Sequence, residues 1–277
     1  MDYLSLIYQI LKILGALGLF LYGMKLMSEA LQKVAGGKIR NFITTFTSTR
    51  IKSIFSGLVI TSVIQSSSAT TVMLVSFVNA GLVTLTESIG LMMGANIGTT
   101  IKIWLITLLG IKFSISMLLL PLIGISFPLI FSKSGKRKSW GEFIMGFSLL
   151  FLGIDFLLVI FPNIGTNLVF IEYLKQFTGH GIWSVLIFIA IGLIFTSIVQ
   201  SSSAMITMTI VMAANGIITF ENAVAMVLGE NIGTTITANM AALVANKTAK
   251  RTALSHTFFN IFGVIWALVV FYPYLNF

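Results

Sequence analysis

The sequence contains a duplicated segment, and this duplication constrains the fold more than any other feature. Residues 58–101 align with residues 193–236 at a constant offset of 135 positions, with 18 identities in 44 positions. A weaker similarity relates Leu19–Gly23 to Leu149–Gly153. Most identities fall in two motifs: Thr-Ser-x-x-Gln-Ser-Ser-Ser-Ala at 61–69 and 196–204, and Gly-x-Asn-Ile-Gly-Thr-Thr-Ile at 94–101 and 229–236. We therefore expect two related halves. A duplicated packing unit would match small and apolar residues, so the matched Gln, Asn and Thr favour a shared polar site.

The chain is too apolar for a water-soluble protein. Of its 277 residues, 57% are hydrophobic and 9% are charged, with a mean hydropathy of +1.01, whereas a soluble domain has about 25% charged residues. The absence of cysteine excludes disulfides and thiol chemistry. The composition predicts an all-α membrane protein, because a span needs about 20 apolar residues. The apolar stretches are 5–31, 53–80, 88–110, 113–131, 142–162, 183–214, 223–245 and 252–275.

The basic residues predict the orientation in the membrane. Twelve of the 17 Lys and Arg residues lie in 32–52, 132–141 and 246–251, which we interpret as exposed cytoplasmic loops by the positive-inside rule. These runs do not form a basic face with interleaved aromatic residues, so a nucleic-acid partner is not expected. All three runs share one side only if 53–80 and 183–214 enter and leave the bilayer on the same side. Six crossings then remain, and both termini lie outside the cell.

We therefore predict two inverted-topology repeats, each with three crossings and one re-entrant helical hairpin. The first repeat is 1–131 with its hairpin at 53–80, the cytoplasmic linker is 132–141, and the second repeat is 142–277 with its hairpin at 183–214. Hairpin arms of about 11–12 residues, or about 17 Å of helix, reach the middle of the bilayer. This plan is typical of secondary transporters, whose site lies where the halves meet.

The serine-rich motifs predict an anion site at the hairpin tips. Serine is a favourable N-cap, so each triplet can start the second arm of its hairpin. A helix N-terminus offers N–H donors and a positive dipole to an oxyanion, and the hydroxyls add further donors. The candidate substrate-binding residues are Gln65, Ser66, Ser67, Ser68, Gln200, Ser201, Ser202 and Ser203.

The Asn-Ile-Gly-Thr-Thr motifs predict a site for a hard monovalent cation such as Na⁺, because their ligands are neutral oxygens. Close packing of Gly90, Gly94 and Gly98 explains the glycines alone. Lys25 and Glu29 are four residues apart and predict an ion pair, and Lys102 is interpreted as interfacial, with its amine reaching the headgroups. Glu230 stands beside the second motif and is a candidate cation ligand or proton site.

The paired motifs, together with His256-Thr257-Phe258-Phe259-Asn260, resemble the type II sodium–phosphate cotransporter family, which includes bacterial Na/Pi cotransporters. The resemblance extends from about Gly15 to about Gly263. It implies that the Gln-Ser-Ser-Ser tips bind phosphate and help to bind sodium. The implied sodium ligands are Gln65, Ser68, Asn96, Thr99, Gln200, Ser203, Asn231, Thr234 and Thr235, with Thr100, Glu230 and Asn260 as further candidates.

The sequence departs from this family in two places. Many bacterial members carry a soluble helical domain after the last span, which we do not expect in a chain that ends at Phe277. Electrogenic animal members have an acidic residue where Pro121–Ile125 is apolar, which suggests fewer sodium ions per cycle.

The resulting hypothesis is a sodium-coupled secondary active transporter of the inner cell membrane that imports inorganic phosphate by alternating access. Its partners are phosphate, Na⁺ as the co-transported ion and the lipid bilayer, with no cofactor. Another oxyanion or a small carboxylate, or a passive anion channel, stays open as an alternative. A hydrolase with Ser67 or Ser202 as nucleophile is disfavoured, because neither of the two histidines belongs to a repeated motif. We therefore do not expect an enzyme.

Overall fold

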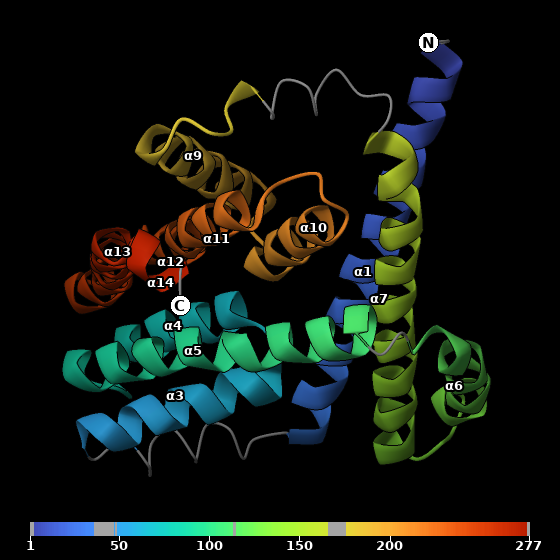
Figure 1. The fold of residues 1–277 in the computed structure, drawn as a ribbon. Coiled ribbons are helices and arrows are strands. Elements are labelled where there is room, and N and C mark those ends of the chain that lie inside the picture. The colour runs from blue at the N-terminus through green and yellow to red at the C-terminus, as the bar shows by residue number, and fades with distance from the viewer. Residues whose placement is uncertain (1–2, 36–46, 48, 113–114, 166–175, 276–277) are drawn as a thin grey trace.

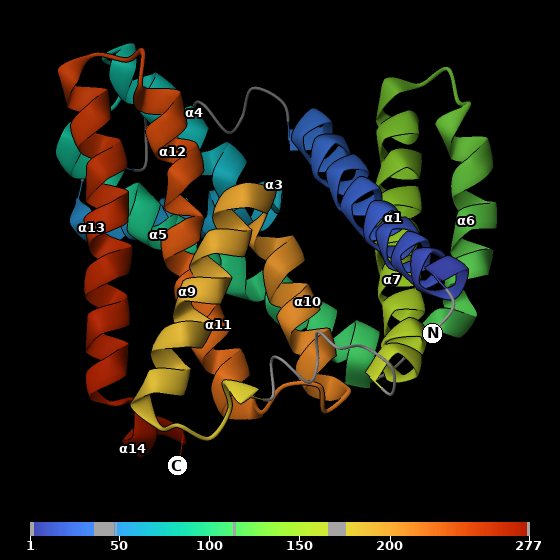
Figure 2. The same ribbon diagram turned by 90° about the horizontal axis from the view of Figure 1, so that it is seen from above.

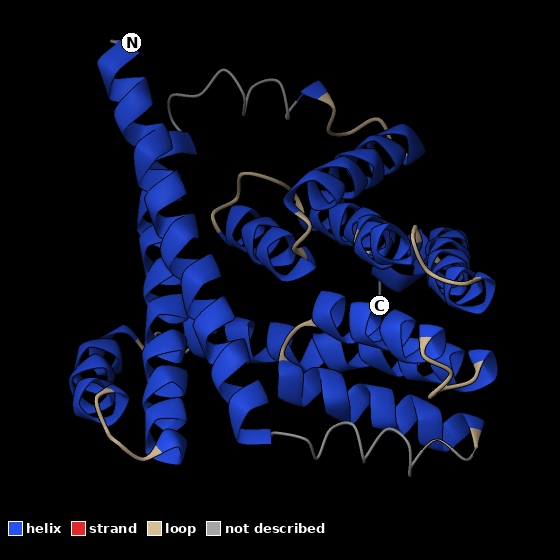
Figure 3. Ribbon diagram, turned by 180° about the vertical axis from the view of Figure 1, so that it is seen from behind, coloured by secondary structure: helices blue, strands red, loops and turns tan. Residues whose placement is uncertain are grey.

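The computed structural model describes residues 3–35, 47, 49–112, 115–165 and 176–275, and every regular element within them is a helix (Figures 1 and 3). Lys38, Arg40 and the chain ends at 1–2 and 276–277 lie outside the described residues. Within these described ranges, five helices are long and apolar enough to cross a membrane: Ile7–Val34, Leu85–Gly110, Gly135–Ile160, Ile182–Val199 and Lys247–Val269. The prediction of an all-helical, multi-pass membrane protein is confirmed.

The helices follow the apolar stretches of the sequence closely. The first part of the chain forms α1 (Tyr3–Ala35), α3 (Arg50–Ile64), α4 (Ser67–Asn79), α5 (Leu85–Leu105), the π-helix η1 (Ile106–Lys112) and α6 (Ser116–Ile130). The second part forms α7 (Gly135–Gly165), α9 (Ile182–Val199), α10 (Ser202–Ala214), α11 (Phe220–Gly233), α12 (Thr235–Ala242), α13 (Lys247–Val269) and α14 (Phe271–Leu275).

Both predicted hairpins are broken helix pairs. The break after α3 is at Gln65 and the break after α9 is at Gln200, and both glutamines have left-handed backbone, with φ of 59° and 55°. Ser66 and Ser201 then cap the second arms. The Ser66 hydroxyl accepts from the Ala69 N–H at 3.2 Å, and the Ser201 hydroxyl accepts from the Ala204 N–H at 3.4 Å. The expected N-caps are confirmed.

Three predicted boundaries were wrong. The first arm of each hairpin is longer than about 11–12 residues: α3 has 15 residues and α9 has 18. Both helices begin before the predicted hairpins, α3 at Arg50 after its N-cap Thr49 and α9 at Ile182. The predicted linker 132–141 is largely the beginning of α7, although its lysines and arginine are exposed as expected. The predicted crossing 223–245 is not one helix, since α11 ends at Gly233 and α12 begins at Thr235.

α1 and α7 pack antiparallel on one side of the molecule, with α6 against α7 (Figures 1 and 2). Their close approach needs glycine, because a Cβ at Gly23 would overlap the backbone of Leu150 and a Cβ at Gly153 would overlap that of Phe20. The weaker sequence similarity equates Gly23 with Gly153 and Phe20 with Leu150. Exchanging the halves therefore converts one contact into the other, as an approximate twofold axis does.

The pair α3–α5 and the pair α9–α11 also pack through equivalent contacts. A Cβ at Gly94 would overlap the carbonyl oxygen of Ile54, and a Cβ at Gly229 would overlap that of Ile189. These positions are related by the offset of 135. The close-packing interpretation of the glycines is confirmed. The same relation holds for Gly57 on Leu91 and Gly192 on Met226, and for Gly98 on Leu58 and Gly233 on Leu193.

The second arm of each hairpin packs against helices of the other half. α4 contacts α12 and α13, while α10 contacts α1 and α5 as well as α7. Polar bonds reinforce the contact with α13: the Asn246 N–H donates to the side-chain oxygen of Asn79, at the end of α4, at 2.7 Å. On the neighbouring helix α5, the hydroxyl of Ser88 lies 3.0 Å from that of Thr252 on α13. The two halves are therefore interlocked, and the hairpin tips meet between them.

Candidate functional site

The two Gln-Ser-Ser-Ser segments line one cavity of about 260 Å³. Because a single water needs only about 10–15 Å³ by this kind of measure, the cavity has room for a small anion and several waters. The structure thus brings together all eight candidate substrate-binding residues. The cavity is lined by Met24, Lys25, Ser28, Glu29, Gln32, Gln65, Ser66, Ser67, Ser68, Lys102, Gln200, Ser201, Ser202 and Ser203.

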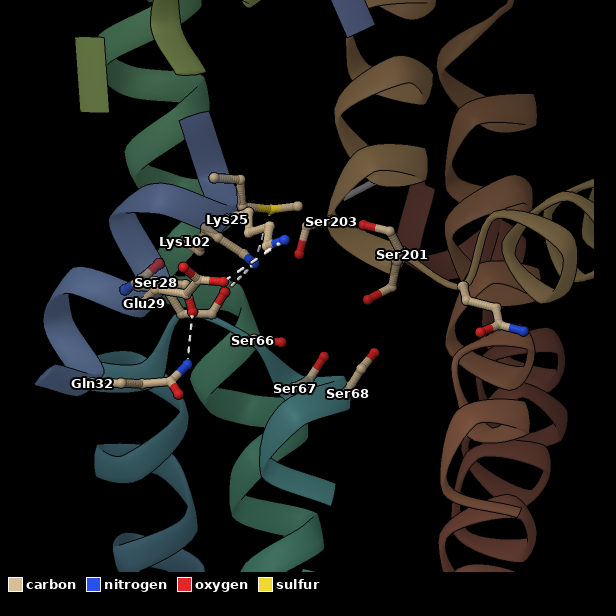
Figure 4. Close-up of a pocket in the computed structure, with 14 residues that line it drawn as sticks. Lys25, Ser28, Glu29, Gln32, Ser66, Ser67, Ser68, Lys102, Ser201 and Ser203 are labelled. Atoms are coloured by element: carbon tan, nitrogen blue, oxygen red, sulfur yellow. Dashed lines mark hydrogen bonds and ion pairs between the residues drawn. The ribbon is translucent and has the colours of Figure 1, made fainter. Parts of the chain in front are cut away.

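Each tip presents the start of a helix to this cavity. α4 begins at Ser67 and α10 at Ser202, so the first N–H groups of both helices have no acceptor within their own helix. In Figure 4 the side chains of Ser67 and Ser68 point across the cavity towards Ser201 and Ser203. Hydroxyl and amide donors therefore converge from two directions, an arrangement suited to an oxyanion.

The two glutamines differ in their surroundings despite equal backbone conformations. Gln65 is buried, its amide nitrogen donates to the carbonyl oxygen of Ser62, and its side-chain oxygen has no partner among the described residues. Gln200 is exposed, and its amide nitrogen lies 3.5 Å from the Met240 sulfur. The cavity is therefore not symmetric, although its two tips are equivalent in sequence.

Polar side chains of α1 line the cavity and were not among the predicted site residues. The hydroxyl of Ser28 donates to the Ile64 carbonyl at 2.5 Å and accepts from the Gln32 amide at 3.1 Å, which holds α1 against the first tip. The predicted ion pair between Lys25 and Glu29 is confirmed at 3.9 Å. The spacing of Lys25, Glu29 and Gln32 on one helical face is the sequence signal that identifies this wall.

Lys102 is also part of the cavity wall, and its predicted interfacial position was wrong. The residue is only 4% exposed, and its Nζ donates to the carbonyl oxygen of Gln65 at 2.6 Å. The left-handed conformation of Gln65 directs that carbonyl out of the helical ladder. The amine therefore finds an acceptor inside the protein and has no need to reach the headgroups.

The Asn-Ile-Gly-Thr-Thr segments do not line the cavity. Asn96 instead joins α5 to α13: its amide donates to the Asn260 side-chain oxygen at 2.7 Å, and its own oxygen lies 3.2 Å from the His256 ring nitrogen. The hydroxyls of Thr99 and Thr100 donate to backbone carbonyls of α5. The hydroxyl of Thr235, the first residue of α12, donates to the Ile232 carbonyl of α11.

In the second half, Asn231 precedes the helix break, and Thr234 stands at the break itself. Glu230 is fully buried there and accepts from the Thr209 hydroxyl at 2.6 Å, while its second carboxyl oxygen has no partner among the described residues. The hydroxyls of Thr61 and Thr196 are buried too, and neither has a hydrogen-bond partner in the described part of the chain. These two threonines are equivalent in the repeat, so both halves place an unused oxygen one helical turn before the tip.

Comparison with known proteins identifies the family. Residues 19–158 and 165–273 match the family described as Na+/Pi-cotransporter. The uncharacterized protein YqeW of Bacillus subtilis is 33% identical over 271 residues, which cover 93% of this chain and 80% of that protein.

The names of two further relatives refer to phosphate transport. The putative inorganic phosphate export protein YjbB of Salmonella typhimurium is 28% identical over 96% of this chain and 48% of its own length, so the chain spans about half of that relative. The human sodium-dependent phosphate transport protein 2B is 44% identical over 28% of this chain and 12% of its own length. No solved structure matches the chain. The protein belongs to the Na+/Pi-cotransporter family, a family of transporters rather than enzymes.

Proposed function

We propose that the protein is a secondary active transporter of the cell membrane that couples the movement of inorganic phosphate to sodium. The observation that carries this proposal is the single cavity of about 260 Å³ lined by equivalent helix tips from the two halves. Membership of the Na+/Pi-cotransporter family supports phosphate as the substrate and sodium as the driving ion.

In this proposal the phosphate oxygens accept hydrogen bonds from the donors of the two tips. The hydroxyls and first N–H groups around Ser66–Ser68 and Ser201–Ser203 bind the anion from opposite directions, with Gln65 and Gln200 at the edges. Hydrogen bonds to a charged group contribute about 1.5–3 kcal/mol each. Several such bonds compensate for the loss of the anion's hydration.

Sodium is bound by uncharged oxygens behind the tips. In the second half these come from Gln200, Ser203, Asn231, Thr234 and Thr235. The equivalent residues of the first half are Gln65, Ser68, Asn96 and Thr99. The interruption between α11 and α12 supports this assignment, because discontinuous helices supply the carbonyl and hydroxyl ligands of sodium in transporters. Cation and anion then stabilise each other's binding reciprocally.

Alternating access follows from an inverted arrangement of the halves, in which one half rocks against the other around the fixed site. The antiparallel pair α1–α7, with its exchangeable glycine contacts, supports such an arrangement. A sodium gradient directed into the cell makes import the favoured direction. Export is the second candidate, because several relatives are named putative phosphate export proteins.

The proposal is tested by radiolabelled phosphate uptake into proteoliposomes of known protein orientation. We expect an inward sodium gradient to produce transient accumulation of phosphate that an equal potassium gradient does not produce. Sulfate and arsenate as competitors report the choice among oxyanions. Phosphate that equilibrates across the membrane without accumulating would indicate a channel. Accumulation only in proteoliposomes that hold the protein in the opposite orientation would indicate export.

A further inference from the structure

Lys102 distinguishes the two halves, because it directly follows the first Asn-Ile-Gly-Thr-Thr-Ile segment, where the two halves match closely in sequence. Its counterpart at the offset of 135 is Thr237 in α12. Lys102 follows Gly98 by four residues, as Thr237 follows Gly233, and both glycines pack against the first arm of a hairpin. A primary amine therefore occupies the place where the second half has a hydroxyl.

The amine of Lys102 lies where a cation would be bound. It donates to the carbonyl of Gln65, the left-handed residue that ends α3, and this carbonyl lies outside the hydrogen-bond pattern of the helix. Unwound backbone carbonyls of this kind are the ligands that sodium uses in transporters with broken helices. In the second half, Gln200 has the same left-handed conformation, and the hydroxyl of Thr237 donates to the Thr234 carbonyl at 3.0 Å, which leaves its lone pairs for a cation.

The backbone supports the same contrast. α5 runs without interruption from Leu85 to Leu105 through the first Asn-Ile-Gly-Thr-Thr segment, whereas α11 and α12 are separated at Thr234 within the second. The second half therefore has a junction between two helices next to its hydroxyls, and the first half has a continuous helix with an amine instead. Asn96 is engaged with Asn260 and the His256 ring, so its role is to hold α5 against α13.

The charge of Lys102 is not balanced by any of the residues that the structure describes. Its Nζ makes no ion pair among the described residues, and Glu29 of the cavity wall is already paired with Lys25. A buried charge of this kind is costly unless it is compensated. Because Lys102 lines the same cavity as both serine triplets, a bound anion would compensate it.

We propose that the ammonium group of Lys102 takes the place of a sodium ion in the first half. The first half then binds no co-transported sodium, and the transported ion binds in the second half, near Gln200 and Thr237. This inference rests on the proposed sodium–phosphate transport. Each transport cycle moves one sodium ion fewer than two equivalent halves would move.

The test converts the first half into a copy of the second. Lys102→Thr restores the hydroxyl of the repeat, Lys102→Met supplies neither a charge nor a hydroxyl, and Lys102→Arg keeps the charge. Lys250→Thr is the matched control, because it removes an exposed lysine at the start of α13, outside the cavity. Phosphate uptake is measured in proteoliposomes as a function of sodium concentration for each protein.

For Lys102→Thr we expect the Hill coefficient for sodium to rise from about one to about two. The sodium concentration that gives half-maximal uptake should rise about fivefold. At saturating sodium, the phosphate KM returns to the wild-type value, because the ion replaces the amine. For Lys102→Met the phosphate KM rises at least about tenfold at every sodium concentration. Lys102→Arg and Lys250→Thr keep the wild-type sodium dependence. A merely structural role of Lys102 would not produce rescue by sodium.

An unchanged Hill coefficient in a folded Lys102→Thr protein would overturn the inference while leaving the proposed transport intact. Wild-type protein without sodium-stimulated uptake would instead overturn the proposed function. If Lys102→Thr does not fold, binding of radioactive sodium to purified wild-type protein decides. One ion per chain is expected, and two ions per chain would refute the substitution of lysine for sodium.

Discussion

At the scale of single residues, two glutamines determine where each hairpin breaks. Gln65 and Gln200 have positive φ, a conformation that costs an L-residue roughly 1–2 kcal/mol. The serine that follows each of them caps the next helix, so the break and the new N-terminus are encoded in adjacent positions. The strained residue is therefore compensated locally, and the motif forms the same tip twice.

The serine hydroxyls that face the cavity give the first prediction. Ser67→Ala and Ser202→Ala each remove one donor to a charged ligand, a loss of about 1.5–3 kcal/mol. We expect the phosphate KM for uptake to rise roughly tenfold or more in each variant, with unchanged thermal unfolding. Ser76→Ala is the control, since Ser76 lies on the exposed side of α4, the helix that begins at Ser67, and its hydroxyl donates to the Val72 carbonyl. Wild-type kinetics in both cavity variants would contradict the site.

The two equivalent asparagines give the second prediction, because the structure uses them differently. Asn96→Ala removes the partner of the Asn260 side-chain oxygen and of the His256 Nε2 atom. It should lower stability by about 1–3 kcal/mol, with little change in half-saturating sodium. Asn231→Ala should instead raise half-saturating sodium severalfold. Thermal unfolding and sodium titration of uptake, measured on both variants, separate the two roles. Identical behaviour of the two variants would be inconsistent with the asymmetry.

At the scale of helices, backbone-to-backbone contact through glycine holds each hairpin to its neighbour. Gly94 meets α3 and Gly229 meets α9 at the carbonyl oxygens of equivalent residues. No side chain can enter such a contact without separating the helices. The orientation of each tip therefore depends on small residues some distance along the helix from it.

A methyl group at either contact gives the third prediction. Gly94→Ala and Gly229→Ala should each destabilise the folded protein by about 1–3 kcal/mol, because the added carbon overlaps a backbone carbonyl. The effects should be similar in the two variants, since the contacts are equivalent. Gly124→Ala in α6 has open space and should be neutral or slightly stabilising. Melting temperatures in detergent compare the three, and an unaffected Gly94→Ala protein would argue against the close α3–α5 contact.

At the scale of the whole molecule, the proposed alternation exposes one cavity to two sides of the membrane. Lys25 lines the cavity with an exposed side chain, and the chain contains no cysteine. We predict that Lys25→Cys reacts with an impermeant thiol reagent at a rate that sodium and phosphate together change about tenfold. Lys250→Cys, at the exposed start of α13, should react at a constant rate. Equal rates for Lys25→Cys with and without substrates would exclude movement around this cavity.

Local chemistry made part of this architecture predictable from the sequence. The hairpin breaks, their serine caps and the glycine contacts follow from short motifs whose preferences act within a few residues. The inward position of Lys102 was not predictable in the same way, because only tertiary packing places the Gln65 carbonyl within its reach. The contribution of α1 to the cavity was missed for a related reason: its polar residues belong to no repeated motif. The interruption at Thr234 was also missed, since the same residues in α5 continue the helix.

The exchange of second arms between the halves has a consequence for biosynthesis. α4 ends at Asn79, but its partners α12 and α13 extend to Val269, near the end of the chain. At about 5–20 residues per second, translation takes on the order of ten seconds or more to deliver those partners. During that interval a newly inserted hairpin has one unsatisfied face in the lipid. The nascent protein therefore depends on the insertion machinery, or on temporary neighbours, until its last helix has emerged from the ribosome.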